Sequence, residues 1–271
     1  MQSFMKMKSK INLKKISDSA TKLIVEMAYR SQSGETGSSL CIADILITLY
    51  FKLLKIDPKN PEAKDRDRFV LSKGHGAAAL YAILHLRGFF KKEKLSGYRV
   101  NGGELHAHPS LGAVPGIEVS TGSLGHGLAI GAGIALSLRE ESPKSTVYVL
   151  MGDGECNEGS VWESAMVIKA LGLKNIIVII DNNGFQGFGE TKKTNKVSLK
   201  KEWRGFGWKV FECDGHSHGQ LEEKISLAKK QREPAVVIAN TIAGKGVAKI
   251  ERTLKAHYFV PNEEDYKLSQ G

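Results

Sequence analysis

The sequence predicts a doubly wound α/β domain, in which a mostly parallel sheet is covered by helices on both faces. Two observations indicate this class: short apolar runs alternate with runs at helical spacing, and the segment NIIVIID (175–181) has almost no polar face. A strand that is apolar on both sides needs cover on both, as in a parallel sheet. We expect one domain over 1–271, with a basic N-terminal arm at 1–15 and an irregular tail at about 245–271.

The first half of the chain has a mainly helical pattern. Residues 11–31 carry apolar side chains at helical spacing, and a second helix is expected at 42–54, before Asp57-Pro58. The segment FVLS (69–72) is typical of a short buried strand; KGHG and a helix at 77–87 follow it. Repeated glycines and prolines predict a long loop from about 97 to 125. Loops of that length inside a domain are usually functional or disordered.

The second half follows a regular alternation of helices and strands. We expect helices at 128–138, 160–171 and 221–230, and strands at 147–151, 175–181, 208–212 and 235–239. The strands on either side of helix 160–171 form a βαβ unit, whose crossover is right-handed. The loops that follow them, GDGECNEG and NNGFQG, therefore emerge at the same edge of the sheet, where ligands bind in open α/β folds.

The composition is that of a soluble globular protein, with 41% hydrophobic and 25% charged residues. No run is expected to reach the roughly 18 apolar residues of a membrane helix, and the basic start lacks a secretory signal, so a cytoplasmic location is expected. Cys41, Cys156 and Cys213 are widely spaced, which favours reduced thiols. The net charge of +10 admits a nucleic-acid partner, but no zinc finger or RNA motif accompanies it, and phosphorylated small molecules explain it as well.

The stretch MGDGECNEG (151–159) places three acids among three glycines directly after a strand. Carboxylates so close would repel one another, and a bound cation is the simplest way to offset this repulsion. Asp153 and Asn183 can supply a carboxylate and an amide oxygen to one magnesium or calcium site, with phosphate oxygens as further ligands. Gly154 would leave room for the phosphates. In the alternative interpretation, Asp153 caps its loop and Asn183 occupies a left-handed turn beside Gly184.

These segments resemble a known family. GDG (152–154), followed after 27 residues by Asn182-Asn183, is similar to the binding motif for thiamine diphosphate. Further segments occur in the order found in transketolases: DRFVLSKGHG (67–76), HAHPS (106–110), STGSLGHGLAIGAG (120–133), FGW (206–208) and DGH (214–216). The match covers most of the chain, which is similar to the N-terminal half of a full transketolase and closely resembles the separate N-terminal subunits of split transketolases. It implies the cofactor-binding fold of the family's diphosphate-binding (PP-type) domain.

The resemblance also implies a cofactor site. Asp153, Asn183 and the backbone carbonyl of Phe185 would bind Mg²⁺ (or Ca²⁺ or Mn²⁺), with the diphosphate of the cofactor completing the shell. The backbone at Gly122 and Leu124 would lie against the thiamine. Gly154 would lie beside the diphosphate.

Four further residues are implied in catalysis. His75, His108 and His257 would line the channel above the thiazolium and contact the diphosphate or sugar hydroxyls; histidine suits this task because both of its protonation states are accessible near neutrality. Glu158 would reach across a subunit interface toward the carboxylate that activates the cofactor. Alternatively, Glu158 is an acid at the start of a helix that complements the helix dipole.

The implied activity is the transfer of a two-carbon ketol unit from a ketose to an aldose. Two other functions stay open: a different thiamine diphosphate-dependent carboligase or decarboxylase, such as a deoxyketose synthase, and a non-catalytic regulatory protein that binds the cofactor. A chain of 271 residues leaves no room for the pyrimidine-binding and C-terminal domains of a transketolase. The resemblance therefore implies a separate partner of about 300 residues in an α2β2 assembly.

The segment SGETGSSL (33–40) departs from the family pattern. Transketolases commonly read SGHPGG or SGHIGS, and that histidine helps to bind the donor ketose; Glu35 stands at its position. An ionised glutamate only accepts hydrogen bonds. Three explanations remain: a different substrate, a structural role in which Glu35 contacts a base such as Lys73, or weakened activity. We favour the first, because the segments that serve the cofactor are intact.

Overall fold

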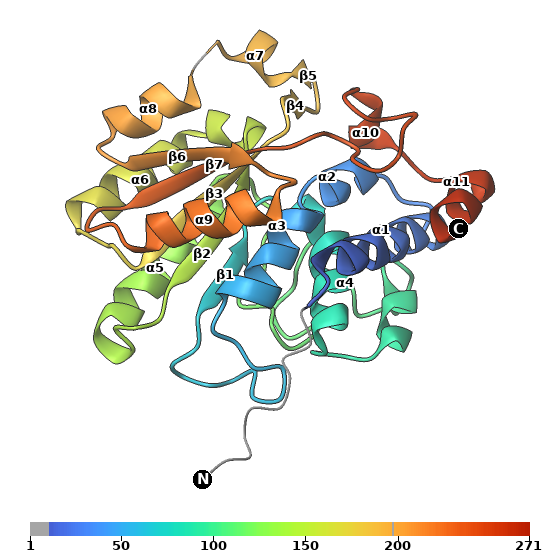
Figure 1. Cartoon of the computed structure of the whole chain (residues 1–271), viewed down its shortest axis with the longest axis horizontal. Coiled ribbons are helices and arrows are strands. Elements are labelled where there is room, and N and C mark those ends of the chain that lie inside the picture. Colours follow the sequence, from blue (N-terminus) through green and yellow to red (C-terminus); the bar gives the residue numbers. More distant parts are fainter. Residues whose placement is uncertain (1–10, 197) are drawn as a thin grey trace.

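The computed structural model describes residues 11–196 and 198–271. Its centre is a five-stranded parallel sheet in the order β1-β2-β3-β7-β6 (Figure 1). The strands are β1 (Arg68–Leu71), β2 (Val147–Gly152), β3 (Ile176–Asn182), β7 (Ala235–Asn240) and β6 (Lys209–Asp214). The parallel order confirms the predicted α/β fold class. Of the predicted basic arm, residues 1–10 lie outside the described part of the chain.

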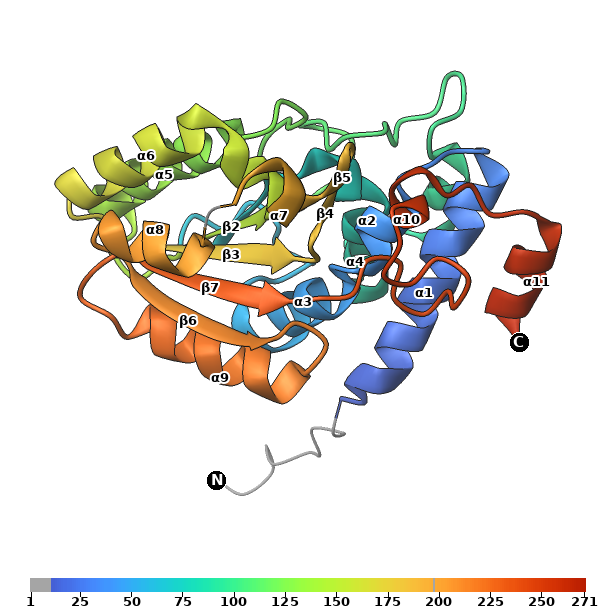
Figure 2. The ribbon, with the colours of Figure 1, turned by 90° about the horizontal axis from the view of Figure 1, so that it is seen from above.

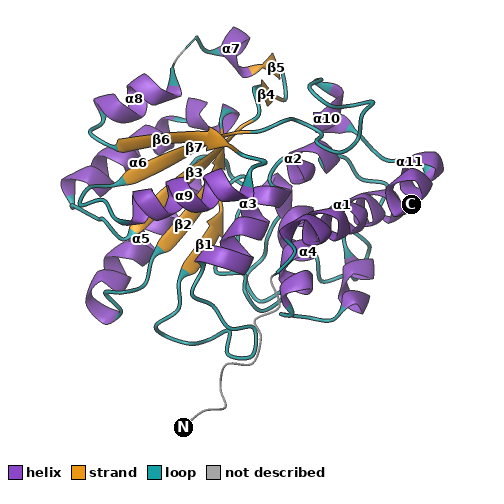
Figure 3. Ribbon diagram, viewed as in Figure 1, coloured by secondary structure: helices purple, strands orange, loops and turns teal. Residues whose placement is uncertain are grey.

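The helices cover both faces of the sheet (Figures 2 and 3). One layer contains α1 (Leu13–Arg30), α3 (Ala43–Thr48), α4 (Ala77–Arg87) and α9 (His218–Lys229), and the other contains α5 (His126–Glu141), α6 (Gly159–Ala170) and α8 (Leu199–Gly205). Successive residues of each strand pack into opposite layers. Phe69 and Leu71 face the first layer, whereas Val70 lies between them and faces the second. This alternation explains why the strands lack a polar face.

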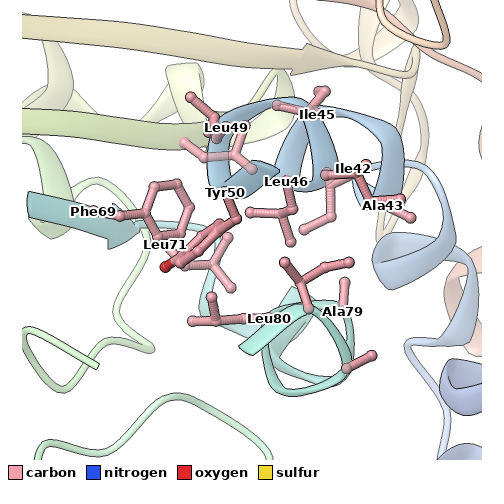
Figure 4. Packing of buried hydrophobic residues seen from close by; sticks show 14 of the residues in the cluster. Ile42, Ala43, Ile45, Leu46, Leu49, Tyr50, Phe69, Leu71, Ala79 and Leu80 are labelled. Atoms are coloured by element: carbon pink, nitrogen blue, oxygen red, sulfur yellow. The ribbon is translucent and has the colours of Figure 1, made fainter. Parts of the chain in front are cut away.

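The first core layer is closely packed around aromatic and aliphatic side chains (Figure 4). The Tyr50 ring meets the Phe69 ring edge to face, with 5.6 Å between the ring centroids. Tyr50 belongs to a π-helical turn, η1 (Leu49–Leu53), which continues α3. Together with α2 (Thr36–Leu40), these turns form a nearly continuous helical stretch beside the sheet.

That stretch corrects one expectation from the sequence. Thr36–Leu53 is long and apolar enough to cross a membrane by length and composition, but 78% of it is buried inside the domain. Its apolar character therefore follows from burial against α1, α4 and the sheet.

The predicted irregular tail also requires correction, because it contains two short helices, α10 (Lys255–Tyr258) and α11 (Glu263–Gln270). A capping box begins α11: Asn262 Oδ1 accepts from the Asp265 N–H, and Asp265 Oδ2 accepts from the Asn262 N–H, both at 2.9 Å. The Tyr266 ring stacks on Tyr29 of α1 at 4.9 Å. None of the residues of α11 is buried, so the apolar periodicity that identifies longer helices is missing.

Candidate functional site

A cavity of about 710 Å³ opens where β2 and β3 end. The loops after β1, β2 and β3 contribute to its wall, together with the long loop at 97–125, α2 and α10. All eleven residues that the resemblance singles out line this cavity: Glu35, His75, His108, Gly122, Leu124, Asp153, Gly154, Glu158, Asn183, Phe185 and His257. Residues up to 222 positions apart in sequence are thus brought together.

Asp153 is held by the loop that follows β3. Its Oδ2 accepts hydrogen bonds from the Gly184 N–H at 3.0 Å and from Thr191 Oγ1 at 2.9 Å. The alternative role of Asp153 as a cap is thus correct in part, but the loop that it ties is the one after β3 and not its own. The alternative for Asn183 is correct in part: Gly184 (φ +80°) occupies the left-handed region instead, but Asn183 Oδ1 accepts from the Phe185 N–H at 2.9 Å and so holds the turn.

The donor set around Asp153 fits a divalent cation. Burial, and then the negative charge of Asp181, raise the pKa of Asp153 to about 6, and a bound cation would counter both effects. No three His, Cys, Asp or Glu side chains cluster into a metal site within the described ranges. A metal here would be bound by one carboxylate, the Asn183 amide oxygen, a backbone carbonyl and oxygens of the ligand, which is the hard set that suits magnesium.

A buried ion pair lies beneath Asn183. Lys73 Nζ is 2.6 Å from Asp181 Oδ2, and the two side chains are 1% and 0% exposed. The same carboxylate oxygen accepts from Asn183 Nδ2 at 2.9 Å, which turns the amide oxygen of Asn183 away from Asp181. Burial disfavours both charges, but their mutual attraction outweighs it: the pKa of Asp181 lies below its usual value and that of Lys73 above.

Gly154 has a packing role in addition to the predicted one. A Cβ at this position would lie 2.8 Å from Gln186 Cβ, so the glycine lets the β4–β5 hairpin (Phe185–Gln186 and Gly189–Glu190) approach the loop after β2. Gln186 Oε1 in turn accepts from Asn157 Nδ2 at 2.9 Å. The glycine therefore brings two cavity walls together, and its role in leaving room for phosphates stays a prediction.

The three predicted histidines gather on one side of the cavity. The rings of His75 and His257 have centroids 6.0 Å apart, and a Cβ on Gly74 would lie 3.0 Å from His108 Cδ2. Burial, and then the charges of Lys73 and His257, lower the pKa of His75 well below its usual value. His75 is therefore a neutral imidazole at pH 7, with one nitrogen that donates and one that accepts.

Glu35 faces His257 and makes no pair with Lys73. Its Oε1 lies 3.8 Å from His257 Nε2, and its Oε2 accepts from Ser38 Oγ at 3.2 Å. The backbone of Glu35 is left-handed (φ 65°), an uncommon conformation for a residue with a Cβ. The suggested partner Lys73 is thus wrong, since Asp181 holds that ammonium group.

Glu158 is exposed at the N-cap of α6 and makes no side-chain capping bond. Its side chain borders the cavity, where it is accessible to a group from outside the chain. The position also suits an acid that complements the helix dipole, so the role of Glu158 stays a prediction.

Close packing between α2 and α10 predicts that Gly37→Ala displaces His257. A Cβ on Gly37 would lie 2.4 Å from the Ala256 carbonyl oxygen and 2.6 Å from Ala256 Cβ, distances that force α10 to move. We expect a loss of about 1–3 kcal/mol in the free energy of unfolding, measured by denaturant titration, and faster amide hydrogen exchange in α10. The matched control is Gly133→Ala in α5, where a Cβ meets nothing within 4 Å. Equal stability and exchange in the two variants would contradict the packing.

Sequence comparisons identify the family of this site. Residues 13–269 match a family model described as "Transketolase, thiamine diphosphate binding domain". The chain belongs to the transketolase family. This finding confirms the resemblance that the motifs indicate.

Two transketolase relatives match over nearly their whole length. The chain is 40% identical over 250 residues to the 6-deoxy-6-sulfo-D-fructose transketolase subunit SqwG of Clostridium sp. (strain MSTE9), covering 92% of this chain and 91% of the relative. It is 38% identical over 256 residues to an apulose-4-phosphate transketolase subunit of Phocaeicola vulgatus, covering 93% and 90%.

Solved transketolases share the fold of this chain but are longer. The structure of the Campylobacter jejuni enzyme matches with a TM-score of 0.90 at 31% identity, covering 95% of this chain and 42% of that one. For the Leishmania mexicana enzyme the TM-score is 0.89 at 29% identity, with 95% and 40% covered. The chain therefore spans about two fifths of the full transketolases.

Two residues of this transketolase-family site do not stand out from the sequence pattern. Asp181 falls within an apolar strand, and Glu155 is one of three neighbouring acids, although both lie buried beneath the cavity loops. A signal for Asp181 does exist: it is the one charged residue in the run NIIVIID, and a charge inside a buried strand requires a partner.

Proposed function

We propose that the chain is the N-terminal, cofactor-binding subunit of a transketolase that transfers a two-carbon ketol unit from a ketose to an aldose. The observation that carries this proposal is the convergence of all eleven expected residues on one cavity at the carboxyl ends of the strands. Family membership supports it, as does the chemistry of the donors around Asp153. A different carboligase or decarboxylase, such as a deoxyketose synthase, would use the same cofactor loops and is the second candidate.

Within this proposal, Asp153, Asn183 and the Phe185 carbonyl hold Mg²⁺, which binds the diphosphate of thiamine diphosphate. When bound, the cofactor supplies the carbon nucleophile and the electron sink for cleavage of the ketose. The loop of Gly122 and Leu124 supports the thiamine. The buried Lys73–Asp181 pair orients the Asn183 amide from below.

The histidines bind the sugar hydroxyls and exchange protons with them. His75, kept neutral by burial, can donate a hydrogen bond from one ring nitrogen and accept one at the other. His108 is exposed on the long loop, and His257 lies beside Glu35. Proton exchange with a substrate hydroxyl at these nitrogens is general acid–base catalysis.

The proposal includes an α2β2 assembly with a separate C-terminal partner. The chain spans about two fifths of full transketolases but about nine tenths of two relatives that are named as subunits. Glu158 is exposed at the cavity edge, and this accessibility supports a contact with such a partner. A cytoplasmic location is part of the proposal, supported by three cysteines that are free and buried.

The test is an assay of ketol transfer with magnesium and thiamine diphosphate, using the chain alone and together with the product of a neighbouring reading frame of about 300 residues. We expect turnover only with both proteins. Turnover by the chain alone would refute the split-enzyme proposal. Consumption of a 2-oxo acid instead of a ketose would favour the second candidate, and cofactor binding without any turnover would favour a regulatory protein.

We further expect Glu35 to select the donor. The relatives are named for 6-deoxy-6-sulfo-D-fructose and apulose 4-phosphate, which are unusual sugars, and a carboxylate at this position reverses what a histidine offers to a hydroxyl. With the partner present, Glu35→His should shift the preference toward xylulose 5-phosphate over unphosphorylated, amino and deoxy ketoses by about tenfold, read as the ratio of kcat/KM values.

The control for this experiment is Glu35→Gln, which keeps the shape of the side chain and removes its charge. If wild type already prefers the usual ketose phosphates and Glu35→His leaves that preference unchanged, Glu35 does not select the substrate. Its role would then be limited to its contacts with Ser38 and His257.

A further inference from the structure

Glu155 lies directly beneath the cavity and connects three of its loops. It belongs to a 3-10 turn, η4 (Gly154–Asn157), and is 3% exposed. Its Oε1 accepts hydrogen bonds from Ser72 Oγ and, at 2.8 Å, from the Gly125 N–H. Its Oε2 accepts from the Gly152 N–H at 3.1 Å. One carboxylate therefore joins the end of β1, the loop before α5 and the end of β2.

These donors account for the presence of a buried acid. A carboxylate out of water needs hydrogen bonds or a cation, and no cation forms an ion pair with Glu155 within the described ranges. Lys73 lies nearby but is paired with Asp181. Because the three loops supply the compensation, they must keep their relative positions for Glu155 to remain buried.

The loop before α5 fits tightly against the same surroundings. Gly125 has φ +80°, and a Cβ there would lie 2.3 Å from Ser160 Oγ and 2.8 Å from Glu158 Cβ. A Cβ on Gly127 would lie 2.3 Å from Ser72 Oγ. The backbone is thus confined on one side by packing, and on the other side by the hydrogen bond to Glu155.

We propose that Glu155 is a positioning residue that holds the thiamine-facing loop at 121–127 in register with the metal-binding loop at 152–154. This inference rests on the proposed function, since the first loop carries Gly122 and Leu124 and the second carries Asp153. Glu155 does not contact the reacting atoms; it fixes the spacing between the site for the thiamine ring and the site for the diphosphate.

The test uses the full chain and three variants, each with the partner subunit present. Glu155→Gln is nearly isosteric, but it replaces one carboxylate oxygen by an NH2 group. That group would face an N–H or O–H donor where the oxygen accepts a hydrogen bond. Ser72→Ala removes one donor and leaves the carboxylate with two. Glu163→Gln is the control, because Glu163 is exposed on α6. Amide hydrogen exchange is measured over 119–128 and over β7, and calorimetry measures the binding of thiamine diphosphate and of inorganic diphosphate, each with magnesium.

In Glu155→Gln we expect exchange over 119–128 to accelerate and the affinity for thiamine diphosphate to fall, each by roughly ten- to hundredfold, the effect of losing hydrogen bonds to a charged group. Exchange over β7 and the affinity for inorganic diphosphate should change less. Ser72→Ala should show smaller shifts in the same direction, and it carries the test if Glu155→Gln does not fold. Glu163→Gln should match wild type.

Unchanged exchange over 119–128 would overturn the proposal, as would faster exchange with unaltered affinity for thiamine diphosphate. In a folded variant, exchange that accelerates equally over β7 and over 119–128 would also overturn it. If wild type together with its partner binds no thiamine diphosphate, the proposed function fails, and the exchange measurement alone decides whether Glu155 holds the loop.

Discussion

Lys73→Met is expected to lower the free energy of unfolding by about 3–5 kcal/mol, the usual cost of leaving one partner of a buried ion pair alone. The variant leaves the Asp181 carboxylate, which is 0% exposed, with hydrogen bonds from Thr241, Cys41 and Asn183 but without a positive charge. The loss is measured by denaturant titration of the chain without cofactor. The loss of stability should be accompanied by greater mobility of the Asn183 side chain, whose amide donates to Asp181, and hence by weaker metal binding.

The matched control is Lys200→Met, whose partner Glu212 is also on the surface, with exposures of 43% and 40% for the two side chains. Its effect should stay below about 1 kcal/mol. The pKa of Asp181 is lowered and that of Lys73 is raised, so their contribution is complete between about pH 4 and pH 10 and is lost outside that window. A deficit of less than about 1 kcal/mol in Lys73→Met near pH 7 would show that the pair does not stabilise the fold.

Asp153→Ala is expected to weaken the magnesium-dependent binding of thiamine diphosphate by about a hundredfold or more, because it removes the charged ligand of the metal. Calorimetry with magnesium, and with the metal chelated, measures the loss. In wild type the same binding should weaken by about tenfold per pH unit below pH 6, since protons then compete for a carboxyl whose pKa is about 6.

The control for this prediction is Glu163→Gln, which leaves the cavity untouched. Far-ultraviolet circular dichroism should show both variants folded. If Asp153→Ala binds thiamine diphosphate with wild-type affinity in the presence of magnesium, Asp153 is not a metal ligand. This conclusion holds even though the cofactor then still binds in the cavity.

Much of this fold could be predicted because long apolar runs report burial directly. The segment NIIVIID matches β3 to within one residue at each end, and the predicted helix at 77–87 coincides with α4. Short elements carry too few residues for a periodic pattern. The β4–β5 hairpin has two residues in each strand, and α7 (Thr191–Thr194) has none buried, so tertiary contacts and not local preference decide their form.

The candidate site divides in the same way. Asp153 and Asn183 were predictable because strand order places the ends of β2 and β3 side by side, and the histidines were found through their motifs. Three contacts could not be predicted: Glu35 with His257, Lys73 with Asp181, and Glu155 with Gly125. They join segments far apart in the sequence, and the spacing of residues does not encode how such segments lie relative to one another.

The most direct test of this account is a structure of the chain crystallised with thiamine diphosphate and magnesium. The account predicts a magnesium ion about 2.1 Å from an Asp153 carboxylate oxygen, the Asn183 amide oxygen, the Phe185 carbonyl oxygen and oxygens of the diphosphate, with the thiamine against the backbone of Gly122 and Leu124. A cofactor bound elsewhere, or a metal held by other residues, would contradict it.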